Sequence, residues 1–426
     1  MGENFLAVIT ITFLVLYFPR LIGWFWWLFP QKRLSCQKKH RFALIVPARD
    51  EGRAVLPLFE SLRGQSYGTG ADRMFETYVV VKNPHDEVID YAREIGAKVY
   101  VDEEQKSKGD CLDYCIRHIL AAGKKYDGYI IVDADCRLDA DFFKNMNDAL
   151  ASGAQVITGR KLVGNYTMCR LKSASKKAAA GHKAAAGHAG VKKNTAVNNK
   201  ITCQNGLIWS IIDELGNRFK SAMGLTTMPI TTGILIRGDL VEEWGGWNYR
   251  QTLTEDMELM RDCACKGIKT FHYSYAKLYL EEAPSHIDTN KRRTRWMTGM
   301  VAADRLYYGK LLGRRGIWAF VDNYYILSLW LVYAYIGLLS AAVVFNIITL
   351  KFSQAAAAFL LIYTAFFALS VMAVLADWKN IGLSWVKKLF LMLMHPFFYM
   401  EYIVIVGRAV FGIKPKKWEK IGRVQY

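Results

Sequence analysis

Hydrophobic and polar residues divide the chain into apolar ends and a mixed middle. The apolar stretches are Phe5–Phe29 near the start, then Tyr324–Leu350 and Phe352–Ala376, the last two without a charged residue. A helix crosses a bilayer with about 20 apolar residues, so each of these stretches predicts a membrane span. A fourth stretch, Leu389–Gly407, contains Pro396, and the sequence leaves open whether it spans fully or re-enters the membrane.

The first apolar stretch has the features of a retained anchor. It lacks the basic start and the small-residue cleavage site of a signal peptide. Trp24, Trp26 and Trp27 precede Lys32 and Arg33, an order typical of an interfacial aromatic belt followed by a cytoplasmic flank. We therefore expect an integral membrane protein of the cell (plasma) membrane, with its polar middle region in the cytoplasm.

The middle of the chain alternates between strand and helix patterns. Five short runs predict strands, at Phe42–Pro47, Thr77–Val81, Lys98–Val101, Tyr129–Val132 and Gln155–Thr158. Helical stretches separate them, a pattern typical of α/β folds with an open, mostly parallel sheet. Ligands of such sheets bind at the carboxyl ends of the strands, so the residues just after each strand are the candidates for function.

We expect five regions along the chain. They are an N-terminal transmembrane anchor (1–31), a cytosolic α/β domain (38–300), interfacial helices (301–322), C-terminal transmembrane or re-entrant helices (323–410) and a basic tail (411–426). Within the α/β domain, residues 172–200 are rich in Ala, Lys and Gly and lack acidic and bulky apolar residues. Such a segment has nothing with which to form a core, so we interpret it as an inserted mobile loop.

The distribution of charge excludes one class of function. The formal net charge is +18, of which +5 falls in residues 31–41, +7 in residues 172–200 and +4 in residues 414–424. The rest of the chain is therefore close to neutral, and we expect no nucleic-acid partner. The eight cysteines show no paired zinc spacing, which favours reduced thiols in a reducing compartment.

Candidate site residues follow four of the predicted strands. They are Pro47, Arg49 and Glu51 after the first, Asn83 and Asp86 after the second, Lys108 beyond the third, and Asp133 and Asp135 after the fourth. Two carboxylates separated by one residue are typical ligands of Mg²⁺ or Mn²⁺, which prefer oxygen atoms. Aspartates of a solvated turn or a helix cap explain the same pair, but its position at a strand end favours metal binding.

Three further motifs lie downstream. Thr232-Gly233 precedes an apolar run, where small residues let the backbone approach a sugar ring or simply form a turn. Thr254-Glu255-Asp256 begins a predicted helix, and a capped helix N-terminus explains these residue types as fully as catalysis does. Arg292, Arg295 and Trp296 form an R-x-x-R-W motif, which suits a diphosphate clamp with a stacked sugar or a basic cluster beside lipid headgroups.

Taken in order, these motifs resemble those of the membrane-embedded family 2 glycosyltransferases, which include cellulose, hyaluronan, chitin and poly-N-acetylglucosamine synthases. The motifs are P-A-R-D-E, K-N-x-x-D, K-x-K-G, D-A-D, T-E-D and R-x-x-R-W, within about residues 40–300. The resemblance implies a GT-A type domain that binds a nucleotide-diphosphate sugar and a divalent metal. It also implies that the sugar is transferred with inversion at its anomeric carbon.

The resemblance assigns a role to each motif. Asp135 would be the metal ligand, Asp133 would contact the nucleotide sugar, and Asp256, beside Glu255, would be the catalytic base. The donor would be bound by Pro47, Arg49, Glu51, Asn83, Asp86, Lys108, Asp133, Arg292 and Arg295, and the acceptor by Trp296, Thr232 and Gly233. The chain departs from the family pattern at Arg292, where glutamine is usual, and at Lys82, where the uracil-binding segment commonly has aspartate.

We therefore expect a membrane-bound inverting hexosyltransferase that moves a sugar from a UDP-sugar to a growing polysaccharide. Two alternatives stay open: a single transfer to a polyprenyl phosphate or glycolipid, and an inactive membrane regulator that binds nucleotide sugars. Membrane lipids and the polysaccharide or lipid-linked acceptor are the other expected partners. The R-x-x-R-W motif near the bilayer favours the polysaccharide, and the intact D-A-D and T-E-D motifs favour an enzyme.

Overall fold

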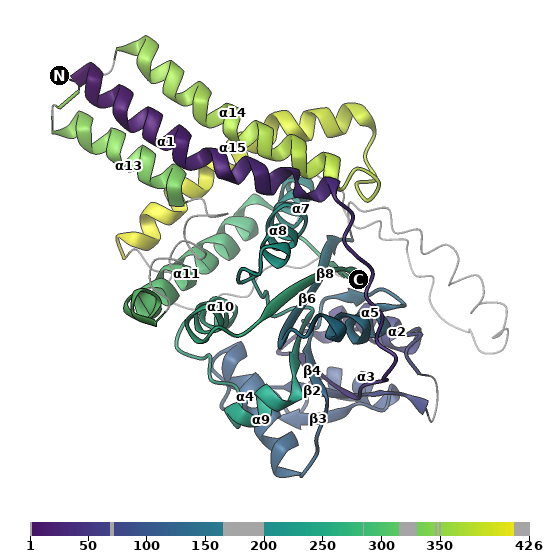
Figure 1. The fold of residues 1–426 in the computed structure, drawn as a ribbon. Coiled ribbons are helices and arrows are strands. Elements are labelled where there is room, and N and C mark those ends of the chain that lie inside the picture. Colours follow the sequence, from purple (N-terminus) through teal and green to yellow (C-terminus); the bar gives the residue numbers. More distant parts are fainter. Residues whose placement is uncertain are drawn as a thin grey trace.

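The computed structural model describes residues 2–68, 72–164, 200–283, 285–314, 330–345, 347–348 and 351–412. The expected insert, apart from Lys200, lies outside the described residues, as do residues 315–322 of the expected interfacial helices and the basic tail beyond Gly412. The described part of the chain combines an α/β sheet with a group of apolar helices at one end (Figure 1).

A mixed eight-stranded sheet, in the order β3-β2-β1-β4-β7-β6-β8-β5, forms the centre of the described α/β part. The strands are β1 (Phe42–Pro47), β2 (Phe75–Val81), β3 (Lys98–Val101), β4 (Gly128–Ile131), β5 (Arg137–Leu138), β6 (Val156–Val163), β7 (Ile234–Arg237) and β8 (Thr270–Leu280). β1 is parallel to β2 and β4, β2 to β3, and β6 to β8, whereas β7 is antiparallel to both neighbours and β5 to β8. The predicted α/β class with a mostly parallel sheet is confirmed.

Apolar side chains cover both faces of the sheet. Along β1, Phe42, Leu44 and Val46 join one core cluster, and Ala43 and Ile45 join the other, because successive side chains of a strand point to opposite faces. The first cluster also takes in α2 (Leu56–Arg63), α3 (Val88–Glu94) and α5 (Phe142–Ala149), and the second takes in α4 (Lys108–Ala121), α9 (Gly238–Trp244) and α10 (Glu255–Lys266). Burial on both faces explains why β1 reads as a continuous apolar run.

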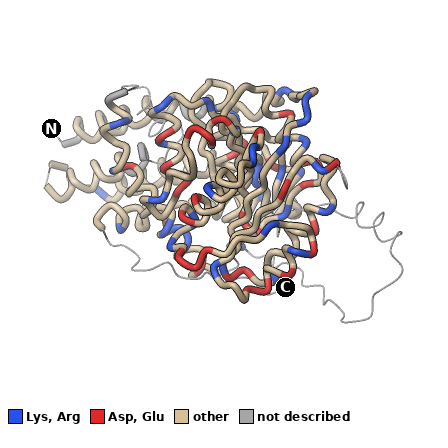
Figure 2. The backbone as a smooth tube through the Cα atoms, turned by 90° about the horizontal axis from the view of Figure 1, so that it is seen from below, with Lys and Arg blue, Asp and Glu red and all other residues tan. Residues whose placement is uncertain are grey.

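Apolar helices lie together at the end of the molecule that holds the N-terminus (Figure 1). They are α1 (Gly2–Phe25), α13 (Trp330–Val344), α14 (Phe352–Ala376) and α15 (Trp385–Val410), and α15 runs continuously through Pro396. By length and composition, α14 and α15 are the two helices in the described ranges that could cross a membrane. Figure 2 shows charged residues concentrated over the α/β part, while the helices near the N-terminus are mostly uncharged.

Helices between these two parts bring them together. They are α7 (Lys200–Ser210), the π-helix η5 (Ile211–Asn217), α8 (Arg218–Ala222) and α11 (His286–Arg314), with short 3-10 turns at η1 (Trp26–Leu28), η2 (Gly52–Val55) and η4 (Leu150–Ser152). η5 packs against α14, and α11 packs against both α10 and α15. α11 continues across residue 300, where the sequence predicted a boundary between the α/β domain and the interfacial helices. The apolar helices therefore lie next to the α/β part through η5 and α11.

Candidate active site

A cavity of about 550 Å³ lies at the carboxyl ends of β1 and β4, where the start of α10 and one side of α11 also reach it. Most of the predicted site residues line it, namely Pro47, Arg49, Glu51, Lys108, Asp133, Asp135, Thr232, Glu255, Asp256, Arg292, Arg295 and Trp296. They meet because β1 and β4 are adjacent parallel strands, whose carboxyl ends open at the same edge of the sheet.

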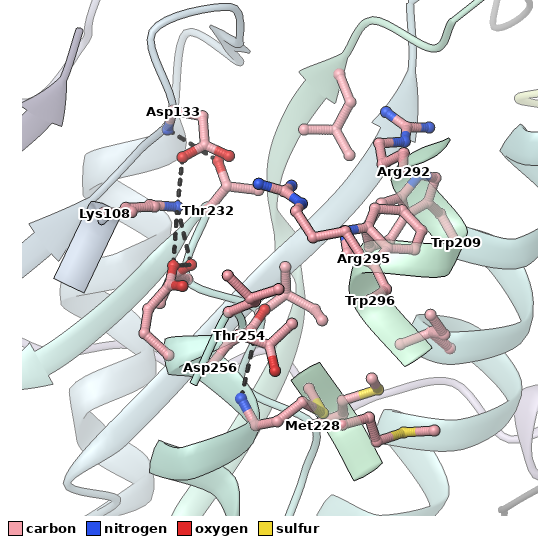
Figure 3. Close-up of a pocket in the computed structure, with 18 of the residues that line it drawn as sticks. Lys108, Asp133, Trp209, Met228, Thr232, Thr254, Asp256, Arg292, Arg295 and Trp296 are labelled. Carbon is pink, nitrogen blue, oxygen red and sulfur yellow. Dashed lines mark hydrogen bonds and ion pairs between the residues drawn. The ribbon is translucent and has the colours of Figure 1, made fainter. Parts of the chain in front are cut away.

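Lys108 connects two carboxylates on one wall of the cavity (Figure 3). Its Nζ donates hydrogen bonds to Asp133 Oδ1 (2.5 Å) and Thr231 Oγ1 (2.9 Å), and lies 3.5 Å from Glu255 Oε1. The Thr231 hydroxyl in turn donates to Glu255 Oε1 (2.9 Å). Burial alone would lower the pKa of Lys108. The charges of Asp133 and Glu255 outweigh this effect and hold the pKa above its ordinary value. Lys108 therefore stays a cation between these carboxylates.

The N-terminus of α4 sets the position of Lys108. Ser107 is the N-cap residue, and its Oγ accepts a hydrogen bond from Asp110 N (3.1 Å). The Asp110 side chain accepts one in return from Ser107 N (3.0 Å), which completes a capping box. Because the capping box fixes where the helix begins, Lys108 is its first residue and reaches Asp133 at the end of β4.

Asp133 and Asp135 follow β4 in the D-A-D loop. Asp133 N donates to Thr232 Oγ1 (3.0 Å), a bond that ties this loop to the turn before β7. Burial and the negative charge of Asp133 raise the pKa of Asp135 to about 6, although Arg292 and Lys108 act in the opposite direction. A cation beside Asp135 would therefore favour its charged form.

Glu255 and Asp256 are the first two residues of α10. Thr254 occupies the N-cap position, but its side chain makes no capping hydrogen bond. Asp256 Oδ1 accepts a hydrogen bond from Met257 N (2.9 Å). Burial and the charge of Glu255 raise the pKa of Asp256 to about 7, against the lowering effect of Lys108. A carboxylate that titrates near neutrality is suited to accept a proton from a substrate.

The helix α11 supplies the opposite wall, with Arg295 and Trp296 directed into the cavity (Figure 3). Arg292 forms an ion pair with the buried Glu282 and lies 4.9 Å from the centre of the Trp296 ring. Trp209 Nε1 donates to Glu282 Oε1 (2.7 Å), and the Trp209 and Trp296 rings meet edge to face. Arg295, by contrast, has no hydrogen-bond or ion-pair partner among the residues that the structure describes. Arg295 is thus the cation of this wall that remains available to a ligand.

Comparison with known families identifies the class of the chain. Residues 40–299, which are more than half of it, match the family described as Glycosyltransferase like family 2. The chain belongs to this family. A second family model, described as Glycosyl transferase family group 2, matches residues 208–406 and so includes α14 and most of α15. The resemblance to family 2 glycosyltransferases is confirmed, and the chain is a transferase.

The chain is also similar to solved structures of two other proteins. The transferase is 15% identical to the mannosyltransferase PcManGT from Pyrobaculum calidifontis in complex with GDP-Man and Mn²⁺, with 94% of this chain and 99% of that chain covered and a TM-score of 0.54. S. aureus TarS 1-349 in complex with UDP is 13% identical, with coverages of 87% and 92% and a TM-score of 0.41. No curated protein sequence matches this chain significantly. The first likeness supports the expected GT-A type fold.

Three predicted site residues of the transferase lie outside the cavity lining. Asn83 Oδ1 and Asp86 Oδ1 each accept a hydrogen bond from the backbone N–H two residues later (2.9 and 3.0 Å), so both shape the turn after β2. Gly233 has a φ of +76°, and a Cβ there would lie 2.4 Å from the Leu278 side chain. The geometry gives each of these three residues a structural role. Their contact with substrate stays a prediction.

The cavity of the transferase also contains residues that the motifs did not single out. Glu281 and Glu282 follow β8, and burial together with the charge of Asp135 raises the pKa of Glu281 to about 7. β8 is parallel to β6, and its carboxyl end reaches the same cavity. A prediction of this strand would have pointed to Glu281 and Glu282, whereas no sequence signal marks Trp209.

Proposed function

We propose that this protein is an inverting glycosyltransferase that moves a sugar from a nucleotide-diphosphate donor, such as a UDP-sugar, to an acceptor hydroxyl at a membrane. One observation carries the proposal: Asp133, Asp135, Asp256 and Arg295 come from three distant segments and line one cavity. Aspartates are suited to bind a metal and to accept a proton. An arginine that makes no hydrogen bond or ion pair in the described ranges is suited to bind a diphosphate.

The donor diphosphate would lie between the D-A-D loop and α11. Arg295 can form two parallel hydrogen bonds with phosphate oxygens, because no described protein group occupies its guanidinium. Lys108 adds a second positive charge on the opposite wall. The Pyrobaculum calidifontis structure with GDP-Man and Mn²⁺ supports a nucleotide sugar as the class of donor.

The pair Asp133 and Asp135 fits a divalent cation such as Mg²⁺ or Mn²⁺. In the described ranges no group of three or more His, Cys, Asp and Glu side chains could hold a metal by itself. Mg²⁺ is commonly held by one or two carboxylates together with substrate phosphates and waters, which is what this pair offers. A metal bound there would help to stabilise the negative charge of the leaving diphosphate.

Asp256 would act as the catalytic base, with Glu255 beside it. The acceptor oxygen bonds to the anomeric carbon while the bond from that carbon to the diphosphate oxygen breaks. The hydroxyl proton passes to Asp256, and the nucleoside diphosphate leaves with the electron pair. Attack opposite the leaving group inverts the anomeric carbon and needs only one base. Arg295 and Lys108 would offset the charge that develops on the diphosphate.

A membrane location belongs to the same proposal. Phe352, Phe359 and Leu360 of α14 are exposed, and large exposed apolar surfaces are rare in proteins surrounded by water. We propose that α14 and α15 lie in the membrane with α1 as an anchor, and that the α/β domain lies in the cytoplasm. Both acceptors considered from the sequence, a growing polysaccharide and a lipid, would use Asp256 in the same way and differ in what fills the rest of the cavity.

Product formation tests this proposal. The purified protein in lipid nanodiscs is incubated with Mg²⁺ or Mn²⁺ and a panel of radiolabelled nucleotide sugars, and products are separated by size and by solubility in organic solvent. We expect one donor to give a labelled acceptor product in the wild type and none in Asp256→Asn. Donor binding without any transfer or hydrolysis across the whole panel would favour the inactive regulator instead.

A further inference from the structure

The cavity that Asp256 lines also has many apolar side chains in its wall. Five methionines line it, namely Met228, Met257, Met260, Met297 and Met300, together with Ile211, Ile212, Leu215 and Ile230. We call these nine residues the methionine compartment. Figure 3 shows Met228 on the same side of the cavity as Asp256, away from the Lys108–Asp133 ion pair.

The methionine compartment lies next to the apolar helices. Its side chains come from η5, α10, α11 and the segment before β7. Trp24 of α1, Leu369 of α14 and Tyr399 of α15 line the same cavity. By length and composition, α14 and α15 are the described helices that could cross a membrane. The cavity thus connects Asp256 with the part of the molecule that is best suited to a bilayer.

Three polar side chains that line the same cavity, those of Asn217, Lys220 and Arg261, are engaged by the protein itself. Asn217 exchanges two hydrogen bonds with the backbone of Met228 (2.8 and 3.3 Å). Lys220 Nζ donates to a backbone carbonyl (3.0 Å), and Arg261 forms an ion pair with Asp304 (2.7 Å). A sugar chain buried here would lose its water and gain few hydrogen bonds in return, which is unfavourable. A hydrocarbon chain makes no hydrogen bonds with water and would therefore lose none on burial.

We propose that the methionine compartment binds the hydrocarbon chain of a lipid acceptor, whose uncharged hydroxyl then lies beside Asp256. This inference rests on the proposed function and specifies the acceptor. The hydroxyl oxygen of the lipid bonds to the anomeric carbon, the hydroxyl proton passes to Asp256, and the nucleoside diphosphate leaves. Methionine side chains are flexible and polarizable, so they adapt to chains of different shape.

Photolabelling tests the compartment without any donor. The probe is decyl glucoside with a diazirine at the end of its chain, added to the full-length protein in lipid nanodiscs. Labelled peptides are mapped by mass spectrometry, and unlabelled hexyl, octyl and decyl glucosides serve as competitors. We expect labels in the peptides around residues 257–260 and 297–300. The competitor concentration for half-inhibition should fall about threefold to fourfold for each added methylene, as for burial of an alkyl chain.

Matched variants separate binding in the compartment from partition into lipid. Met297→Gln with Met300→Gln places polar groups on the wall and should reduce labelling at least about tenfold, because two apolar side chains are lost. Met300→Leu keeps the wall apolar and should retain labelling. Met223→Gln changes an exposed methionine outside the cavity and should leave labelling unchanged. Thermal unfolding of each variant checks that it is folded.

Two results would overturn the lipid acceptor. One is labelling confined to α14 and α15 and unaffected by the Met297 and Met300 substitutions. The other is competition by a water-soluble tetrasaccharide that equals that of decyl glucoside, which would favour the polysaccharide. Since photolabelling needs neither donor nor turnover, its failure is distinct from a failure to find a nucleotide-sugar donor, which would count against the proposed function.

Discussion

At the scale of single residues, the surroundings of each charged group separate structural roles from candidate catalytic roles. Glu282 and Arg292 form an ion pair, whereas Arg295 makes no hydrogen bond or ion pair within the described chain. The D-A-D and T-E-D motifs could be predicted as site residues because their positions at a strand end and a helix start are readable from sequence. The structural role of Glu282 could not be predicted, because it depends on Trp209 and Arg292, which become its neighbours only in the fold.

Removing the charge of Arg295 tests its role toward the diphosphate. We expect Arg295→Gln to weaken donor binding about 10- to 100-fold, since charge-assisted hydrogen bonds contribute about 1.5–3 kcal/mol. The control is Lys310→Gln, which removes an exposed charge on the same helix. Isothermal titration with the preferred nucleotide sugar measures both affinities. An Arg295→Gln protein with the affinity of the wild type would exclude a diphosphate contact.

The pH dependence of transfer follows from the two raised pKa values. Asp256, at about 7, must be deprotonated to accept a proton, and Asp135, at about 6, must be deprotonated to bind a cation. As the pH falls, both carboxylates become protonated and the enzyme loses activity. The value of kcat/KM should therefore rise between pH 5 and pH 8 and then level off. A pH–rate profile of the wild type checks this. A profile that is flat over this range would contradict the assignment of the base.

At the scale of elements, the sequence predicts the strands whose residues are apolar on both faces. It does not predict elements in which polar residues occupy buried positions. In β8 the buried residues include Thr270, His272 and Ser274, and His272 makes a hydrogen bond with Thr158 (3.2 Å). The first half of β8 therefore lacks the hydrophobic alternation that marks a strand. The sequence does not predict η5 for a similar reason: its buried acidic residues form ion pairs with Arg160 and Lys161 of β6 and with Arg218 one turn further on.

One glycine allows α11 to approach the start of α10. A Cβ on Gly299 would lie 2.5 Å from Thr254 Oγ1 and 2.6 Å from its Cγ2, two residues before Asp256. We expect Gly299→Ala to cost about 1–3 kcal/mol of stability through overpacking. It should also slow transfer, because it would shift the start of α10, which holds Asp256, relative to α11.

Gly309 provides the matched control on the same helix. A Cβ there has no atom within 4 Å, so Gly309→Ala should be neutral or should stabilise the helix by up to about 1 kcal/mol. Urea unfolding and transfer rates of both variants give the comparison. Equal behaviour of the two variants would show that the contact between Gly299 and Thr254 does not position the site.

At the scale of the whole molecule, composition predicts the division into an apolar group of helices and an α/β domain. α14 has the same bounds as the apolar stretch Phe352–Ala376, because a long uncharged segment has few alternatives to a helix. The arrangement of α11 and η5 between these two parts could not be predicted. It depends on contacts between segments that are far apart in sequence, and these contacts create the cavity.

Chemical labelling tests the proposed orientation in the membrane. Lys351 lies between α13 and α14, and Lys125 is exposed in the α/β domain. On intact cells, a membrane-impermeant thiol reagent should label a cysteine at position 351 and should miss one at position 125 until the cells are permeabilised. The wild-type protein serves as the control for labelling of the native cysteines. Labelling at position 125 in intact cells would contradict a cytoplasmic catalytic domain.

The transfer rate of Asp256→Asn at saturating donor tests the central claim most directly. Asparagine keeps the size and polarity of the side chain but does not accept a proton at neutral pH. We expect the rate to fall about 10²- to 10⁴-fold while donor affinity stays near that of the wild type. Asp90→Asn, an exposed change on α3, should keep the wild-type rate. A near-normal rate for a folded Asp256→Asn protein would contradict the account of the catalytic base.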